Sequence, residues 1–198
     1  MATSRHARSA TVLQWLEWTL LALGCVAFGW YINEGVASTR EQAALSRELE
    51  LAHTRVSAGS AAIAAIPARS AIARIDVPRL KLSAAAREGV DRRTLRSAVG
   101  HIPGTALPGA PGNAGFAAHR DTFFRPLKGV RTGDEVVLTT PNGVYRYSVV
   151  TTRVVDPSDV SVLSTTTDPT LTLVTCYPFD YIGSAPQRFI VRANLIRQ

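Results

Sequence analysis

The sequence predicts an all-β domain, a closed barrel or a sandwich, that follows one N-terminal membrane helix. An apolar run occupies residues 11–32, and short β-like runs separated by Gly and Pro turns fill the chain from Ser70 onward. Many short strands within about 130 residues are typical of barrels and sandwiches. The 198 residues are enough for one domain and an appendage, not for two full domains.

Residues 11–32 contain a single charged residue, Glu17, and Trp or Tyr residues near both ends. As a helix this run would be about 33 Å long, close to the thickness of a bilayer core, with interfacial aromatic residues. We expect the protein to cross a cell membrane once through this run. Because Arg5 and Arg8 precede the run, we expect residues 1–10 in the cytoplasm and the chain after residue 32 on the outer side. A cleaved signal peptide and a buried core helix are the alternatives.

Residues 33–70 differ in composition from the segments on either side. Apolar residues recur at helical spacing, at Leu45, Leu49, Ala52 and Val56, before Gly59 and Pro67 interrupt the pattern. We interpret this segment as a juxtamembrane helix and a linker that separate the membrane from a domain over residues 71–198. The alternative is a helix that packs against that domain or against another protomer.

Six strands are expected in the domain, and Pro141-Asn142-Gly143 indicates a hairpin between the third and the fourth because Asn-Gly accepts positive φ. The expected strands are Ala71–Val77, Asn113–His119, Glu135–Thr140, Val144–Val155, Leu171–Cys176 and Arg188–Ile196. Two short helical turns are expected at Thr94–Val99 and Ser158–Leu163.

Cys176 is the only cysteine of the domain, since Cys25 lies in the apolar run. It ends a strand next to a loop, where reactive groups are commonly placed. If that strand pairs antiparallel with the next one, Arg188 begins at the end of the sheet where Cys176 finishes, and its guanidinium could stabilise an oxyanion. An inert buried thiol and a surface ion-pair arginine are the alternatives.

A base that activates Cys176 could be His119 or His101. His119 follows the Gly- and Ala-rich strand and therefore lies at a strand end, whereas His101 lies in the turn-like sequence GHIPG. We favour His119 on this ground.

These residues together resemble the sortase signature. The resemblance rests on TLVTC at Thr172–Cys176, on Arg188 twelve positions later and on the upstream His119, and it covers Ser70–Gln198, including the segments HIPGTALPG and HRDTFFRPL. It implies a closed eight-stranded β-barrel with short helices, and a cysteine transpeptidase. By position, Cys176 would be the nucleophile, His119 the general acid and base, and Arg188 the stabiliser of the tetrahedral intermediate.

The resemblance is greatest to class D sortases. The sequence has neither a second hydrophobic segment after the barrel nor an Asp-Pro-aromatic motif within residues 33–70, which argues against the pilin-polymerising class. Ala118 stands where these enzymes often have glycine. Thr175, Ala118 and Tyr177 are the expected substrate-binding residues.

The implied reaction cleaves an LPxTG-like C-terminal sorting signal between Thr and Gly or Ala and transfers the acyl group to an amine of a cell-wall precursor or of a pilin lysine. The expected partners are such substrate proteins, the amine and the lipid bilayer. No metal or cofactor is expected, since Asp134-Glu135 is the only adjacent acidic pair of the domain, and no nucleic acid, since the basic residues there form no run beyond Arg92-Arg93.

Two other classes of protein are alternatives to a sortase. An L,D-transpeptidase would carry His and Gly directly before its cysteine, whereas Val174 and Thr175 precede Cys176 here. A non-catalytic, membrane-anchored β-barrel that binds a partner remains the alternative, and it would have an inert Cys176. Substrate specificity is expected in the loops 154–170 and 177–187.

Overall fold

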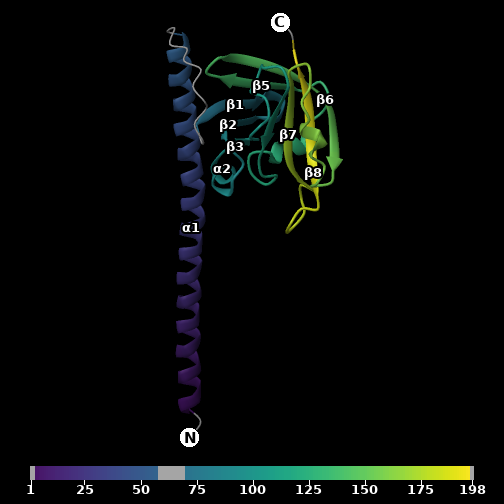
Figure 1. Cartoon of the computed structure of the whole chain (residues 1–198). Helices are drawn as coiled ribbons and strands as arrows, with labels where there is room; N and C mark the ends of the chain where they lie inside the picture. Colours follow the sequence, from purple (N-terminus) through teal and green to yellow (C-terminus); the bar gives the residue numbers. More distant parts are fainter. Residues whose placement is uncertain (1–2, 58–69, 197–198) are drawn as a thin grey trace. The chain divides into compact units, whose positions relative to one another are not determined.

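The computed structural model describes residues 3–57 and 70–196 and divides the chain into two compact units, Met1–Thr39 and Arg40–Gln198. A single helix, α1 (Thr3–Ser57), contains all of the first unit that is described and the beginning of the second. The strands follow from Ala71 onward (Figure 1).

Eight strands close into a barrel in the order β1-β2-β3-β4-β7-β8-β6-β5, which confirms the barrel part of the predicted fold. Their bounds are β1 (Ala71–Val77), β2 (Leu82–Glu88), β3 (Val99–His101), β4 (Asn113–Ala117), β5 (Glu135–Thr140), β6 (Gly143–Val155), β7 (Thr170–Tyr177) and β8 (Gln187–Leu195). Four short helices connect them: η1 (Pro78–Leu80), α2 (Arg92–Ser97), η2 (Arg125–Gly129) and η3 (Val160–Leu163).

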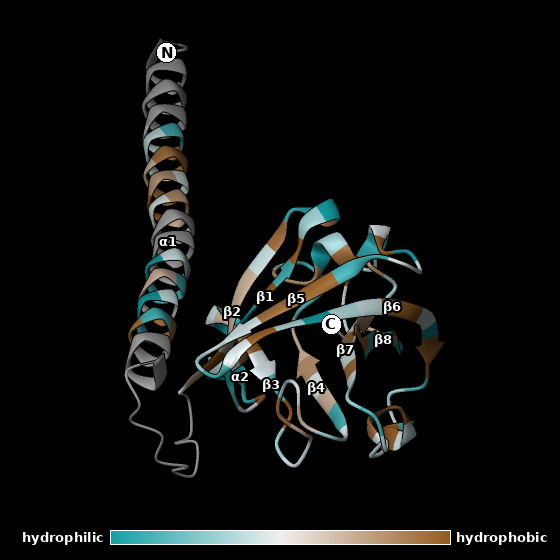
Figure 2. Cartoon of the chain, turned by 90° about the horizontal axis from the view of Figure 1, so that it is seen from above, coloured by the Kyte–Doolittle hydropathy of each residue, from teal (hydrophilic) through white to brown (hydrophobic). Residues whose placement is uncertain are grey.

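The helical conformation expected for residues 11–32 is confirmed by α1. The side chains described there are exposed and largely apolar, including Trp15, Leu20 and Phe28, and Figure 2 shows brown and tan bands in this part of α1. Within the described residues, however, no helix combines the length and the hydropathy that crossing a membrane requires.

Two strands, β2 and β3, were absent from the prediction. The sequence of β2 is LSAAARE, and alanine has a low intrinsic preference for strands. It is a strand because it pairs antiparallel with β1 and because Ala84 and Ala86 face the barrel interior, where both are almost fully buried. Burial against a neighbouring strand therefore overrides local propensity here.

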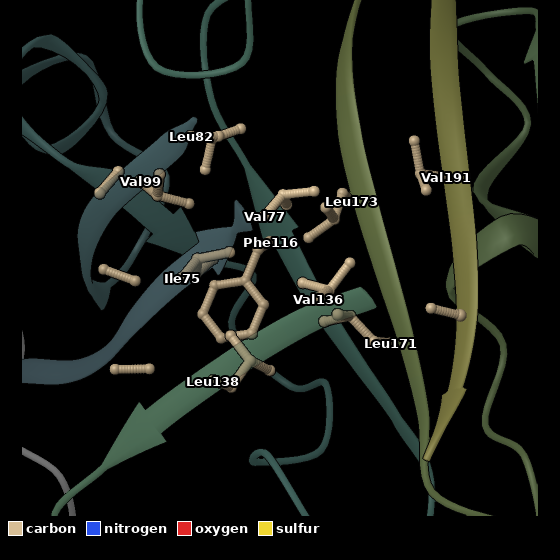
Figure 3. Packing of buried hydrophobic residues seen from close by; sticks show 14 of the residues in the cluster. Ile75, Val77, Leu82, Val99, Phe116, Val136, Leu138, Leu171, Leu173 and Val191 are labelled. Atoms are coloured by element: carbon tan, nitrogen blue, oxygen red, sulfur yellow. The ribbon is translucent and has the colours of Figure 1, made fainter. Parts of the chain in front are cut away.

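The core lies inside the barrel and is contributed by every strand. Figure 3 shows side chains from distant parts of the sequence pointing toward one another around Phe116, which is fully buried. The labelled members are Ile75, Val77, Leu82, Val99, Phe116, Val136, Leu138, Leu171, Leu173 and Val191. Because alternate residues of a strand point to opposite faces, the residues between them on β4, β7 and β8 face outward.

The C-terminal part of α1 packs on the barrel. Leu45 and Leu49 are buried, and Leu45 lies against Ala85 and Ala98. The Gln42 amide accepts from the Ala85 N–H at 2.7 Å and donates to the carbonyl of Ser97. This arrangement matches the packed-helix alternative for residues 33–70 better than a free spacer, and the contacts come from the part of that segment between Gln42 and Leu49.

Candidate active site

Cys176 and Arg188 lie directly opposite each other in the antiparallel pair β7–β8. Opposed residues project from the same face of a sheet, with Cβ atoms about 4.5–5.5 Å apart. Their neighbours Leu173 and Val191 belong to the core, so Cys176 and Arg188 project from the outer face of the barrel. The predicted hairpin register is confirmed.

His119 lies beside Cys176 on the opposite side from Arg188. Strand β4 runs parallel to β7, and its last paired residue, Ala117, is the partner of Val174. The Ala118 N–H donates to the Val174 carbonyl at 3.2 Å, which continues the pairing beyond the end of β4. Continuing this parallel register by two positions from Ala117 aligns the backbone of His119 with Cys176, so we infer that the two residues lie on adjacent chain segments.

The sequence-predicted catalytic residues therefore form a row, His119–Cys176–Arg188, across the neighbouring segments β4, β7 and β8. Cys176 is a free, half-buried thiol and His119 is exposed. Nη1 of Arg188 donates to the carbonyls of Ala185 at 3.3 Å and Gln187 at 3.0 Å. These bonds, one to the β7–β8 loop and one to the first residue of β8, orient the guanidinium at the end of the row.

His101 has a different environment from His119. It is buried, its Nδ1 lies 2.8 Å from Glu88 Oε2, and its Nε2 lies 3.0 Å from the Ala106 carbonyl and 3.1 Å from Thr105 Oγ1. Both ring nitrogens are thereby engaged. This histidine connects β2, β3 and the segment that follows, as expected for a structural residue.

The expected substrate-binding residues Thr175 and Ala118 are buried. Thr175 Oγ1 donates to the Ala118 carbonyl at 2.7 Å, and Ala118 packs in the barrel core. These contacts favour a structural role, in which the pair holds the ends of β4 and β7 together beneath His119 and Cys176. Tyr177 is half-buried and packs against Phe179 and Phe189, with ring centroids 6.1 and 6.2 Å away.

Arg120 connects the His119 segment to the β7–β8 loop. Its Nη2 donates to the carbonyls of Tyr181 at 2.6 Å and Gly183 at 3.0 Å, and its guanidinium carbon lies 5.9 Å from the centroid of the Tyr181 ring. Lys128 forms a second link to this loop through Asp180, and that contact lowers the pKa of Asp180. Sequence reasoning missed Arg120, although its position directly after His119 was a possible signal.

Asn113 connects the floor of the site to η3. Its buried amide nitrogen donates to the carbonyls of Val162 at 3.1 Å and Ser164 at 3.4 Å, while its Oδ1 accepts from Thr172 Oγ1 at 2.7 Å. The β6–β7 loop, expected to carry specificity, is thereby attached to two strands of the site. In the sequence, the polar residue Asn113 at the start of an otherwise apolar strand is the feature that indicates this attachment.

Asp156 lies in the same loop and interacts electrostatically with Arg188. Its carboxylate accepts from the hydroxyl of Ser158 at 2.6 Å and from its N–H at 2.9 Å. These bonds to Ser158, with a smaller contribution from the Arg188 charge, lower the pKa of Asp156. The guanidinium therefore has an ionised neighbour at neutral pH.

No group of three or more His, Cys, Asp or Glu residues in the described chain is arranged to hold a metal ion. Asp134, one half of the adjacent acidic pair, is paired with Arg79 and accepts from the Arg131 N–H at 2.8 Å. Its bond to Arg79 lowers its pKa. This carboxylate is therefore engaged in holding two turns together.

Comparisons with known proteins identify the family of the chain. The family model of the sortase domain matches residues 75–196. Sortase D of Bacillus subtilis is 34% identical over 118 residues, which are 59% of this chain and 60% of that protein. Sortase A of Listeria monocytogenes is 35% identical over 88 residues, 42% of this chain and 38% of that protein, so the matched segments cover less than two thirds of both relatives.

Solved structures show the same fold. A Clostridium perfringens sortase D5 transpeptidase superposes with a TM-score of 0.67 at 27% identity, over 81% of this chain and 98% of that one. The match to Listeria monocytogenes sortase A has a TM-score of 0.58 at 26% identity and covers 64% and 88% of the two chains. The expected resemblance to class D is confirmed by two of these proteins, and the chain belongs to the sortase family.

Proposed function

We propose that this protein is a cysteine transpeptidase in which Cys176 is the nucleophile, His119 the general acid and base, and Arg188 the oxyanion stabiliser. The observation that carries the proposal is the row His119–Cys176–Arg188 on one outer face of the barrel. A thiol, a titratable group and a fixed guanidinium are the parts that acyl transfer through a thioester requires.

In the first step the Cys176 thiolate attacks a peptide carbonyl carbon, and the negative charge that develops on the oxygen is stabilised by Arg188. The C–N bond then breaks, the leaving amine takes a proton from His119, and a thioester to Cys176 remains. The C-terminal tail of the substrate departs at this point.

In the second step a primary amine attacks the thioester carbonyl carbon and gives a proton to His119. The C–S bond breaks, a new amide bond forms, and the thiolate of Cys176 returns. When water replaces the amine, the same sequence gives hydrolysis. Each step uses groups of this chain and the two substrates alone.

We propose as substrates proteins with an LPxTG-like C-terminal sorting signal, cleaved between Thr and Gly or Ala. The acceptor would be an amine of a cell-wall precursor or of a pilin lysine. Family membership supports this class of substrate, and the attachment of η3 through Asn113 supports a role of the β6–β7 loop in reading the signal. Peptides that differ at the cleavage position test the choice between Gly and Ala.

The nucleophile is tested by tail release from a sorting-signal peptide, measured for the full chain and for Cys176→Ala. We expect release by the parent protein and none by Cys176→Ala, with an almost unchanged thermal midpoint. Cys25→Ala is the matched control, because it removes the other thiol from an exposed position on α1 and should leave release intact. Release that survives in Cys176→Ala would rule out the proposed enzyme and favour a binding module.

We further propose that α1 anchors the protein in a cell membrane, with its N-terminus in the cytoplasm and the barrel outside. The exposed apolar side chains between Trp15 and Phe28 support an apolar environment around this segment. Alkaline extraction of membranes from producing cells tests the proposal, since an anchored chain should stay in the pellet and require detergent. Recovery in the alkaline supernatant would contradict it.

A further inference from the structure

A second group of polar residues lies on the same outer face as the row His119–Cys176–Arg188. On β8, Ile190 and Arg192 follow Arg188 at every second position and therefore project from the same face. On β6, Arg153 is the partner of Ile190 and Thr151 is the partner of Arg192. The face thus continues from the thiol toward two further arginines.

These two arginines border a small cavity. A hollow of about 70 Å³ is lined by Thr151, Arg153, Ser161, Val162, Ile190 and Arg192. Val162 and Ile190 are buried and pack together with Val155, so the hollow has an apolar floor and a basic rim. A water molecule occupies about 30 Å³ in the liquid, so the space is suited to a group of about two or three heavy atoms.

Neither guanidinium has an acidic partner among the residues that the structure describes. The ion pairs formed by the other arginines of the barrel involve Arg74, Arg79, Arg87 and Arg146. The carboxylate of Asp159, two residues before the lining residue Ser161, accepts from the N–H and hydroxyl of Ser161 as the N-terminal cap of η3. Two uncompensated positive charges on one hollow favour an anionic ligand.

We propose that the cavity between Arg153 and Arg192 binds a carboxylate of the amine that accepts the acyl group. The guanidinium group is planar and donates two parallel hydrogen bonds, which match the two oxygens of a carboxylate. The inference rests on the proposed transpeptidase function and adds the chemical class of the second substrate, a primary amine that also carries a carboxylate.

The position of the cavity suits this role. Ile190 and Arg192 lie two and four residues from Arg188, which corresponds to about 7 and 13 Å along a strand. A lysine-like side chain can separate its amine from its carboxylate by the shorter of these distances. Helix η3 lies between the cavity and the β4 side of the face, where Leu163 approaches Gly115. The acceptor can therefore approach the thioester from the β6–β8 side.

The test compares two acceptors that differ only in charge, Nα-acetyl-lysine and Nα-acetyl-lysinamide. The full-length protein is given one sorting-signal peptide, and kcat/KM for the amide product is measured for each acceptor by mass spectrometry. We expect about a tenfold preference for the carboxylate form, the scale of a charge-assisted hydrogen bond, which weakens as the salt concentration rises. In Arg153→Gln/Arg192→Gln the preference should fall to about one.

The matched control is Arg93→Gln, which removes the same charge from an exposed position on α2 and should retain the preference. Arg153→Gln alone provides a second variant at an exposed site if the double variant folds poorly. An equal rate for both acceptors in the parent protein, or a preference that survives in the double variant, would overturn the proposal.

Two additional measurements separate the possible failures. Release of the peptide tail without any added amine reports acylation alone. If no tail is released, the proposed function is contradicted, and the failure is not due to the carboxylate site. The second measurement compares peptides that carry Glu or Gln next to the cleavage position. A dependence on Arg153 and Arg192 that appears only with the Glu peptide would place the carboxylate on the sorting signal and overturn the assignment to the acceptor.

Discussion

The two histidines of the barrel occupy similar positions in the sequence of strands but very different environments. His101 ends β3 and His119 follows β4, and these strands are neighbours. His101 is 2% exposed and both of its ring nitrogens are engaged, whereas His119 is exposed. A position at a strand end therefore does not by itself determine the environment of a histidine; the residues on the neighbouring strands determine it.

The topology explains the difference. Strand β3 is antiparallel to β4, so His101 lies opposite Phe116, three residues before His119, with ring centroids 5.1 Å apart. On its other side β3 is parallel to β2, and this pairing places Glu88 next to His101. Strand β4 is parallel to β7, and the continuation of that pairing through Ala118 brings the His119 segment next to the end of β7 that carries Cys176. The ring of His101 therefore has a carboxylate partner, whereas His119 follows a strand that is paired with the strand of Cys176.

The largest expected effect that separates the two regions is on the rate. His119→Ala should lower the acylation rate by about 10²- to 10⁴-fold, because it removes the proposed general acid and base. His101→Ala should lower the rate per folded molecule far less. Single-turnover release of the peptide tail at saturating peptide measures both. If His101→Ala loses more activity than His119→Ala, the active face has been placed at the wrong end of the barrel.

The next effect tests the other member of the row. Arg188→Lys should lower acylation by about 10²- to 10³-fold, since lysine keeps the charge but lacks the planar pair of donors that an oxyanion requires. Arg188→Ala should be impaired at least as strongly. Arg93→Lys, at an exposed position on α2, is the control for an arginine-to-lysine change. Acylation at the parental rate in Arg188→Lys would show that charge alone is sufficient at this position.

Much of this comparison could be predicted from the sequence. Strand-favouring residues before Cys176 and the hairpin length predict the register with Arg188, and the structure confirms it. The choice of His119 over His101 as the partner of Cys176 also agrees with the parallel pairing of β4 and β7. In both cases the signal is local, because it depends on where a strand ends.

The remainder depends on contacts between residues that are distant in the sequence. No local pattern links Gln42 to Ala85, Asn113 to Val162 or Arg120 to Tyr181. Thr175 is buried because it alternates with Cys176 and faces the barrel interior, but its hydrogen bond to the Ala118 carbonyl across two strands is not revealed by a motif. Tertiary hydrogen bonds of this kind require the fold before they can be inferred.

A smaller effect concerns stability and reverses the order of the two histidines. His101→Ala should lower the free energy of unfolding by about 2–4 kcal/mol, because the carboxylate of Glu88 and the carbonyl of Ala106 lose their buried partner. His119→Ala should change it by no more than about 0.5 kcal/mol, as is usual at exposed positions. Urea unfolding measures both. Equal losses would mean that the hydrogen bonds of His101 add nothing to stability.

The smallest expected effect concerns the acidic residue near Arg188, which differs from the acidic residue near His101. Glu88 bonds His101 directly, whereas Asp156 acts on Arg188 through charge while it holds Ser158. Asp156→Asn should therefore change acylation by no more than about fivefold, the scale of an exposed charge pair.

Because the pKa of Asp156 is lowered, its carboxylate is ionised in the folded protein throughout the neutral range. Its contribution to stability is complete above its unfolded pKa of about 3.9 and is lost as the pH falls through the lower folded value. The free energies of unfolding of the parent protein and of Asp156→Asn should thus differ by a constant amount from pH 6 to 8 and converge only in acid. A difference that varies between pH 6 and 8 would assign the effect to another titrating group.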